Sequence, residues 1–167
     1  MSDETRIAKL EHELGRLTDI RAIEQLKYRY ASYCDKGYDP SGIASCFTPD
    51  GVWVVNGVGG DVAGHDAIRA HCCELAKTIS WALHFVVAPR VELASDRTSA
   101  VGHFYLLCLC TIARSGEAAE KDAVILTLNY TDKFVKRGDH WLFTELRGTM
   151  HQASNWDMGW VKQPWRP

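Results

Sequence analysis

The sequence LHFVVAPRVEL, residues 83–93, is the most informative stretch of the chain. Its β-branched and aromatic residues are typical of a strand, and we expect this strand to begin at His84. Residues 27–35, KYRYASYCD, are typical of the end of a helix that closes on Asp35. We interpret the fold as one that brings Asp35 to His84 inside one pocket.

Length and charge limit the functions that the chain can have. With 167 residues and a formal charge of -2, we expect one domain over 1–167, with a helical extension at 1–17 and a Trp-rich tail at 153–167. The sequence has no cluster of basic residues that would indicate nucleic-acid binding. No apolar run reaches the roughly 18 residues of a membrane span. The N-terminus is polar and unlike a signal peptide, so a cytoplasmic protein is expected.

Cysteines and histidines do not form a metal-binding pattern. The six cysteines, at 34, 46, 72, 73, 108 and 110, fit neither a zinc site nor a secreted disulfide scaffold. Cys108 and Cys110 alternate in an apolar strand and are expected to be reduced core residues. No HxH or HExxH spacing occurs, so no metal site is predicted. Four histidines are interpreted as solvent-facing or structural: His65, His71, His103 and His140.

Helical spacing dominates the start of the chain. A short amphipathic helix is predicted over 4–16, and Asp19 is a candidate N-cap for a second helix that runs to about Tyr33. Gly37 supplies the stop of that helix. The apolar stripe of the first helix needs a partner, either in its own domain or in another subunit; it consists of Ile7, Leu10, Leu14 and Leu17.

The middle of the chain mixes short elements, and the end is rich in strands. A helical turn from Asp39, a turn at 48–51, a strand at 52–55, a glycine loop at 57–64 and a helix from His65 to about Ala76 are predicted. Four β-rich runs follow, at 81–94, 98–113, 121–136 and 140–152. Helices followed by hairpin strands predict the α+β class. We expect a cone-shaped barrel, in which a strongly curved, mostly antiparallel sheet wraps around the N-terminal helices and encloses a ligand pocket.

The order of these elements resembles the SnoaL-like branch of the nuclear-transport-factor-2-like superfamily, an α+β cone fold. The resemblance covers about Leu17 to Gln152. It rests on four segments in this order: IEQLKYRYASYCDKGYD at 23–39, FTPDGVW at 47–53, HFVV at 84–87 and GDHWLF at 138–143.

Members of this branch that are similar in these positions include scytalone dehydratase, bile acid 7α-dehydratase and hexachlorocyclohexane dehydrochlorinase, all cofactor-free lyases built on an Asp–His pair. Asp35 and His84 match that pair, and Tyr30 matches the tyrosine five residues before the aspartate in the bile acid enzyme. Arg147 is similar, after a one-residue shift, to an arginine on the last strand of the dehydrochlorinase. A second aspartate of the bile acid enzyme falls at about Cys108 here, so the resemblance implies no second carboxylate.

The three predicted catalytic residues have distinct roles. Elimination beside an acidified C–H needs a base with a pKa near neutrality, which His84 offers. Asp35 would fix its tautomer and stabilise the imidazolium that forms. Tyr30 would donate a proton or a hydrogen bond to a leaving hydroxyl or an enolate oxygen. The structural alternative is a capped helix end, a core histidine and a core tyrosine.

Six further residues are expected to contact the substrate. Arg147 should be half-buried in the last strand and hold an anionic group, unless it forms a salt bridge with Glu145. His151 shares the face of Arg147 if that strand is regular. Phe104 and Cys108 lie on the more apolar face of their strand, which is assigned to the pocket or core. The complete expected set is Tyr33, Trp53, Phe104, Cys108, Arg147 and His151.

Two classes of function remain open. The first is a cofactor-free lyase or isomerase that acts on a small, mostly apolar cyclic molecule. The alternative is a non-catalytic ligand-binding or assembly module, such as the β subunit of a ring-hydroxylating dioxygenase, which shares the fold. An apolar outer face on an open sheet favours a homo-oligomer, and the resemblance implies a trimer or a dimer. The Trp-rich tail, with Trp156, Trp160 and Trp165, is expected to pack on its own domain or on a neighbour.

Overall fold

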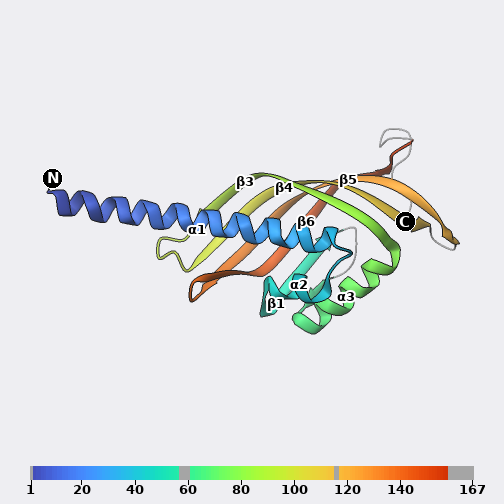
Figure 1. Cartoon of the computed structure of the whole chain (residues 1–167), viewed down its shortest axis with the longest axis horizontal. Helices are drawn as coiled ribbons and strands as arrows, with labels where there is room; N and C mark the ends of the chain where they lie inside the picture. Colours follow the sequence, from blue (N-terminus) through green and yellow to red (C-terminus); the bar gives the residue numbers. More distant parts are fainter. Residues whose placement is uncertain (1, 57–60, 115–116, 158–167) are drawn as a thin grey trace.

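The computed structural model describes residues 2–56, 61–114 and 117–157. Helices come first and long strands follow, so the predicted α+β class is confirmed (Figure 1). The elements are α1 (Asp3–Asp35), α2 (Pro40–Ser45), β1 (Phe47–Asn56), β2 (Val62–Ala63), α3 (His65–Thr78), β3 (Ile79–Leu93), β4 (Ser99–Arg114), β5 (Glu117–Arg137) and β6 (His140–Asn155).

The six strands form one curved sheet in the order β2-β1-β6-β5-β4-β3. Every neighbouring pair is antiparallel except β1 and β6, which run parallel. The sheet curves over the C-terminal half of α1 and the helices α2 and α3 (Figure 1). It does not close, because β2 and β3 form its two free edges. The expected cone of a mostly antiparallel sheet around N-terminal helices is therefore confirmed.

The two helices predicted at the start of the chain are one continuous helix, α1. Its N-cap is Ser2, whose side chain accepts a hydrogen bond from the backbone N–H of Thr5. Asp19, predicted as a cap, lies in mid-helix with only 3% of its surface exposed. Its carboxylate accepts hydrogen bonds from the side chains of Arg97, Lys136 and Trp141. A polar residue at this point joins α1 to the sheet and does not interrupt the helix.

The hydrophobic core lies between α1 and the concave face of the sheet. Ile23, Leu26 and Tyr30 project from α1 at helical spacing and are at most 3% exposed. Alternate residues of the strands meet them, including Phe104 and Phe134. This packing fixes the end of α1, and with it Asp35, against the sheet.

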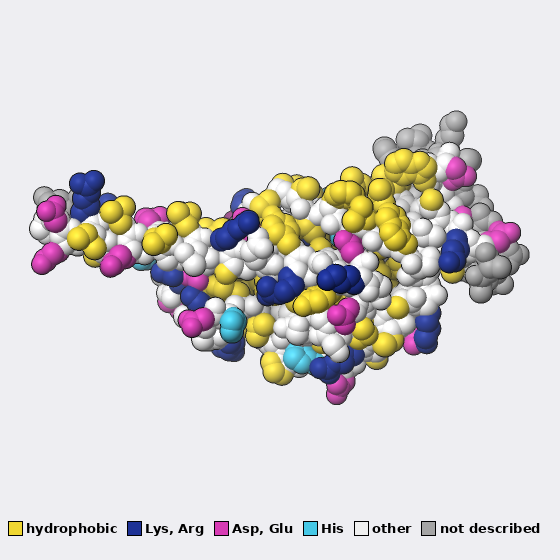
Figure 2. Space-filling view, in the orientation of Figure 1, with side chains coloured by type: hydrophobic (Ala, Val, Ile, Leu, Met, Phe, Trp, Pro, Cys, Tyr) yellow, Lys and Arg dark blue, Asp and Glu magenta, His cyan; other side chains and the backbone are white. Residues whose placement is uncertain are grey.

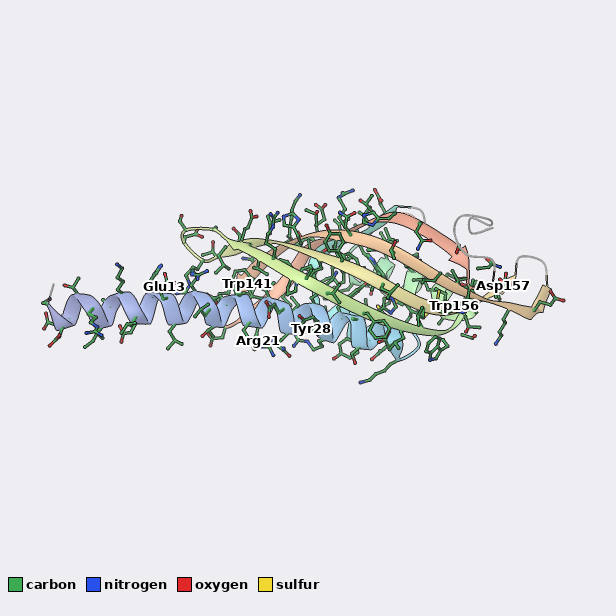
Figure 3. All side chains as sticks on the ribbon, turned by 90° about the horizontal axis from the view of Figure 1, so that it is seen from above. Glu13, Arg21, Tyr28, Trp141, Trp156 and Asp157 are labelled. Carbon is green, nitrogen blue, oxygen red and sulfur yellow. The ribbon has the colours of Figure 1, made fainter. Side chains whose placement is uncertain are left out.

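The first half of α1 extends beyond the sheet (Figures 1 and 3). Glu13, labelled in Figure 3, lies on this free part of the helix. The side chains of its apolar stripe are 55–66% exposed, although such a stripe normally packs against a partner. The stripe consists of Ile7, Leu10, Leu14 and Leu17. None of the helices in the described part of the chain is long and apolar enough to cross a membrane.

Strand bounds differ from the predicted ones where the sheet bends. Strand β3 begins at Ile79 and not at His84, so the histidine lies inside the strand. Strand β1 begins at Phe47 and includes the segment predicted as a turn, and its register against β6 shifts between Phe47 and Val52. Pro49 and Gly51 lie in this interval, and both residue types within a strand are typical of a bulge.

Candidate active site

Asp35 and His84 meet as predicted. Asp35 is the last residue of α1, and one of its carboxylate oxygens, Oδ1, accepts two hydrogen bonds from His84. The ring Nδ1 donates over 2.7 Å and the backbone N–H over 2.9 Å. The His84 side chain is 8% exposed and that of Asp35 is 25% exposed. A carboxylate bound to Nδ1 leaves Nε2 as the ring nitrogen that can accept a proton.

His84 faces a pocket of about 570 Å³ of empty space, its open mouth included. The lining side chains come from α1, the segment after it, β1, α3, β3, β4 and β5. None of the lining residues in the described part of the chain is a lysine, arginine, aspartate or glutamate. The polar lining consists of Tyr30, Tyr38, Trp53, His71, His84 and Tyr130. The pocket is therefore mostly apolar, with hydroxyl, imidazole and indole groups in its wall.

Tyr30 lies in the pocket wall with 3% of its surface exposed. Burial raises the pKa of its phenol well above the ordinary value, so the hydroxyl stays protonated and can act as a hydrogen-bond donor. It interacts with the thiol of Cys34 and the hydroxyl of Tyr130. Edge-on contacts with the rings of Trp53 and Phe143, both at 5.8 Å between centroids, hold the phenol in place.

Behind the pocket wall formed by Tyr30 lies an ion pair that was not predicted from the sequence. Lys27 and Asp132 are fully buried and 2.8 Å apart. The Lys27 Nζ is also 3.1 Å from the centroid of the Tyr130 ring, within the range of a cation–π contact. Burial lowers the pKa of Lys27 and raises that of Asp132, while each partner opposes the shift in the other. The sequence held a signal, because Asp132 continues the inward alternation of Leu128, Tyr130 and Phe134 on β5.

Cys108 and Cys110 are buried, free thiols in the pocket wall, as predicted for core cysteines. Their side chains interact, which together with burial raises the pKa of Cys108. In the described residues, no three side chains of His, Cys, Asp or Glu come close enough to hold a metal ion.

Arg147 is exposed and does not line the pocket, contrary to its predicted position. Its guanidinium donates to Glu145 over 2.6 Å, which is the alternative that the sequence left open. The cause is a bulge in β6. Lys133 pairs with Glu145, but the next residue of β5 pairs with Phe143, so β6 contains one extra residue at this point. One extra residue moves every following side chain to the opposite face of the sheet.

Three other expected substrate contacts lie away from the pocket. His151 shares the exposed outer face with Arg147, as the strand pattern predicted, and bonds to Asn129 over 2.8 Å. Phe104 is 1% exposed and belongs to the core. Tyr33 packs against α2, where its ring occupies the space that a side chain at Gly42 would need. Of the expected contacts, Trp53 and Cys108 line the pocket.

Besides Tyr130, two polar residues of the pocket lining were not recognised from the sequence. Tyr38 follows the helix stop at Gly37, adopts a φ of 57° and presents its ring edge-on to His84 at 6.2 Å. Its backbone conformation, rare for a residue with a side chain, gave no signal in the sequence. His71, interpreted as solvent-facing or structural, lines the pocket from α3. It lies three residues after the buried Ile68, so the helical period placed it near the buried face.

The Trp-rich tail is only partly described. Trp156, labelled in Figure 3, directly follows β6, and 62% of its surface is exposed in the described part of the chain. Trp160 and Trp165 lie outside the described residues, as do residues 57–60 of the predicted glycine loop.

Comparisons with known proteins agree with this architecture. A family model described as the SnoaL-like domain matches residues 15–147. No curated protein sequence matches the chain. A candidate scytalone dehydratase of Novosphingobium aromaticivorans is 19% identical with a TM-score of 0.73, covering 91% of this chain and 97% of its own.

Two further solved structures have the same fold. The hexachlorocyclohexane dehydrochlorinase LinA-type3 of Novosphingobium barchaimii is 23% identical with a TM-score of 0.74, covering 86% of this chain and 93% of its own. A protein of Novosphingobium aromaticivorans, described as like nuclear transport factor 2 with a cystatin-like fold, is 20% identical with a TM-score of 0.65, covering 90% and 92%. At these identities the likeness extends to the fold alone.

Proposed function

Because the chain belongs to the SnoaL-like domain family, we propose that it is a cofactor-free lyase of the dehydratase type, or an isomerase, with His84 as its general base. One observation carries this proposal: the bond of 2.7 Å from His84 Nδ1 to Asp35 beside a pocket that His84 lines. A scytalone dehydratase candidate and a dehydrochlorinase among the solved structures of the same fold support this class of reaction.

The proposed reaction begins with removal of a proton from carbon. The free Nε2 of His84 takes the proton, and the carboxylate of Asp35 stabilises the imidazolium that results. The electron pair of the C–H bond forms a new double bond, and the leaving group departs or an enolate forms. Tyr30, held protonated by burial, donates a hydrogen bond to the oxygen that gains charge.

The substrate that fits this site is a small, uncharged, mostly apolar cyclic molecule. The absence of charged side chains from the described lining would leave an ionic substrate without a partner. Aliphatic residues of β4 and β5, among them Leu106 and Leu128, offer contact to a ring.

A substrate-independent probe tests the base. The compound 5-nitrobenzisoxazole opens to a nitrile and a coloured phenoxide when a base removes one C–H proton. We expect the wild-type protein to catalyse this opening, and His84→Ala to lower kcat/KM by about 10²-fold or more with little change in the melting temperature. Wild-type protein without catalysis, or His84→Ala with full activity, would contradict the proposal.

The alternative function is an assembly module, as in a dioxygenase β subunit. The surface that either assembly with another subunit or self-association would use is the outer apolar patch, which we define as the exposed side chains of Trp81, Leu83, Phe85, Val87, Tyr105 and Leu107 on β3 and β4 (Figure 2). We propose that a second copy of this chain covers the patch, because contiguous exposed apolar surface marks an interface. Co-purification with a large iron–sulfur subunit, together with an inactive benzisoxazole assay, would favour the assembly module.

A further inference from the structure

His71 is a second histidine in the wall of the pocket that contains His84. It projects from α3, is half-buried, and packs edge-to-face with Trp53 at 5.2 Å between centroids and an interplanar angle of 84°. The contact with the Trp53 ring restricts the rotation of the imidazole. The protein therefore holds the imidazole in a defined position, and a side chain that acts on a ligand needs such a position.

The ring nitrogens of His71 are unpaired within the described part of the chain. Other histidines use theirs in structural bonds: His65 with the carbonyl of Phe47, His103 with Thr131 and His151 with Asn129. A polar ring in an apolar wall without a protein partner is left to bond to water or a ligand. One nitrogen of a neutral imidazole is a donor and the other an acceptor, so His71 can meet either kind of ligand atom.

The two pocket histidines have opposite electrostatic surroundings. His84 has a carboxylate on its Nδ1, whereas His71 packs on Trp53 and shares the pocket wall with apolar side chains such as Leu75 and Ile79. Burial among these groups lowers the pKa of His71, which keeps the ring neutral near pH 7. Titratable groups whose surroundings differ in this way take different roles in acid–base chemistry.

We propose that His71 is a second catalytic residue, a neutral hydrogen-bond donor to the substrate oxygen that gains negative charge while His84 removes the proton. This inference rests on the proposed function and adds a substrate requirement: an uncharged molecule with an oxygen function near the acidic C–H. The C–H electron pair forms the new π bond, and the proton goes to His84. The bond to the leaving oxygen breaks, the oxygen keeps the electron pair of that bond, and it accepts a hydrogen bond from the N–H of His71.

A series of benzisoxazoles with different ring substituents tests this role, because the substituent changes the basicity of the leaving phenoxide. The informative variant is His71→Phe, which keeps an aromatic ring against Trp53 but has no N–H. We expect kcat/KM to fall roughly tenfold for the most basic leaving oxygen and less for the least basic one, giving a steeper dependence on leaving-group basicity. His71→Gln keeps a hydrogen-bond donor, so its kcat/KM should depend on leaving-group basicity more nearly as in the wild-type protein.

The outcomes separate this inference from the proposed function. The exposed His151→Phe is the matched control and should behave as wild type. An equal loss across the series, or no loss, in a folded His71→Phe protein would mean that His71 only packs, and would overturn the inference while catalysis by His84 stands. If His71→Phe does not fold, His71→Gln decides: the inference requires that kcat/KM depend less steeply on leaving-group basicity in His71→Gln than in His71→Leu, and equal dependences would overturn it. Wild-type protein without base catalysis overturns the proposed function itself.

Discussion

A single carboxylate oxygen of Asp35 binds His84 at two atoms, the ring Nδ1 and the backbone nitrogen of β3. The first bond fixes the tautomer of the ring, and the second holds the carboxylate against the backbone of β3. Asp35 ends α1, so the bond also joins the helix to the sheet at the pocket. The geometry of the pair therefore depends on α1 as a whole and on the core that holds it.

The first prediction concerns the charge of Asp35. Asp35→Asn keeps an oxygen that can accept both hydrogen bonds but cannot stabilise an imidazolium. We expect kcat/KM for 5-nitrobenzisoxazole to fall by about 10²-fold or more, and the free energy of unfolding to fall by only about 1 kcal/mol.

Asp39→Ala is the matched control for this variant. Asp39 caps α2 by accepting from the backbone N–H groups of Ser41 and Gly42. Its loss should cost about 1 kcal/mol in stability and leave the rate per folded molecule unchanged. Equal activity of Asp35→Asn and Asp39→Ala would show that the carboxylate of Asp35 serves only the fold.

The second prediction concerns the buried pair of Lys27 and Asp132. Lys27→Met leaves a fully buried carboxylate without its cation, so we expect the free energy of unfolding to fall by about 3–5 kcal/mol. Adding Asp132→Asn removes the charge while its side-chain oxygen can still accept the backbone N–H of Arg147, which should recover much of the loss. Denaturant unfolding of both variants measures the difference, and a double variant no more stable than Lys27→Met would contradict this account.

How far the sequence predicts the fold is clear from the helical face of α1. Ile23, Leu26 and Tyr30 recur in the sequence at the spacing of one helical face, and all three are buried. The meeting of Asp35 with His84 also followed from the sequence, through the resemblance of the surrounding segments. Periodicity carries such information because burial of one face dominates the energetics of an amphipathic element.

The substrate contacts were harder to predict, because a bulge leaves no clear mark in sequence. Trp141 and Phe143 are buried, and a regular strand would place Arg147 on the same face. The extra residue in β6 reverses that order and exposes Arg147. The buried Asp19 was mistaken for a cap for a related reason: the carboxylate types that cap helices also form ion pairs, and only the tertiary partners distinguish the two.

The third prediction concerns acid stability. Burial opposes the charge of Asp19, but hydrogen bonds from Lys136, Trp141 and Arg97 prevail and hold its pKa below the ordinary 3.8. A carboxyl with a lower pKa in the folded state stabilises the fold above its unfolded pKa, and this stabilisation is lost as the pH falls through the folded value. We therefore expect Asp19→Asn to cost about 1.5–3 kcal/mol near neutral pH.

The cost of Asp19→Asn should shrink as the pH falls from 3.8 through the lower pKa of the folded protein, because the wild-type carboxyl becomes protonated first in the unfolded chain and then in the folded one. Urea unfolding of both proteins over this range measures the effect. Asp66→Asn is the control, since Asp66 forms an exposed pair with Arg69 on α3 and should cost less than about 1 kcal/mol at any pH. A cost for Asp19→Asn that is independent of pH would contradict the assigned charge.

The fourth prediction concerns self-association through the outer apolar patch. Side chains of this patch are 36–56% exposed on one chain, and hydrophobic groups gather over β3 and β4 in Figure 2. We expect light scattering to give a wild-type mass that is a multiple of 18.7 kDa, a trimer by the family resemblance or a dimer. The double variant Trp81→Glu and Phe85→Glu should be monomeric yet folded, because both side chains point away from the core. Thr149→Glu, exposed on β6, should keep the wild-type mass, whereas a monomeric wild-type protein would show that the patch has another partner or none.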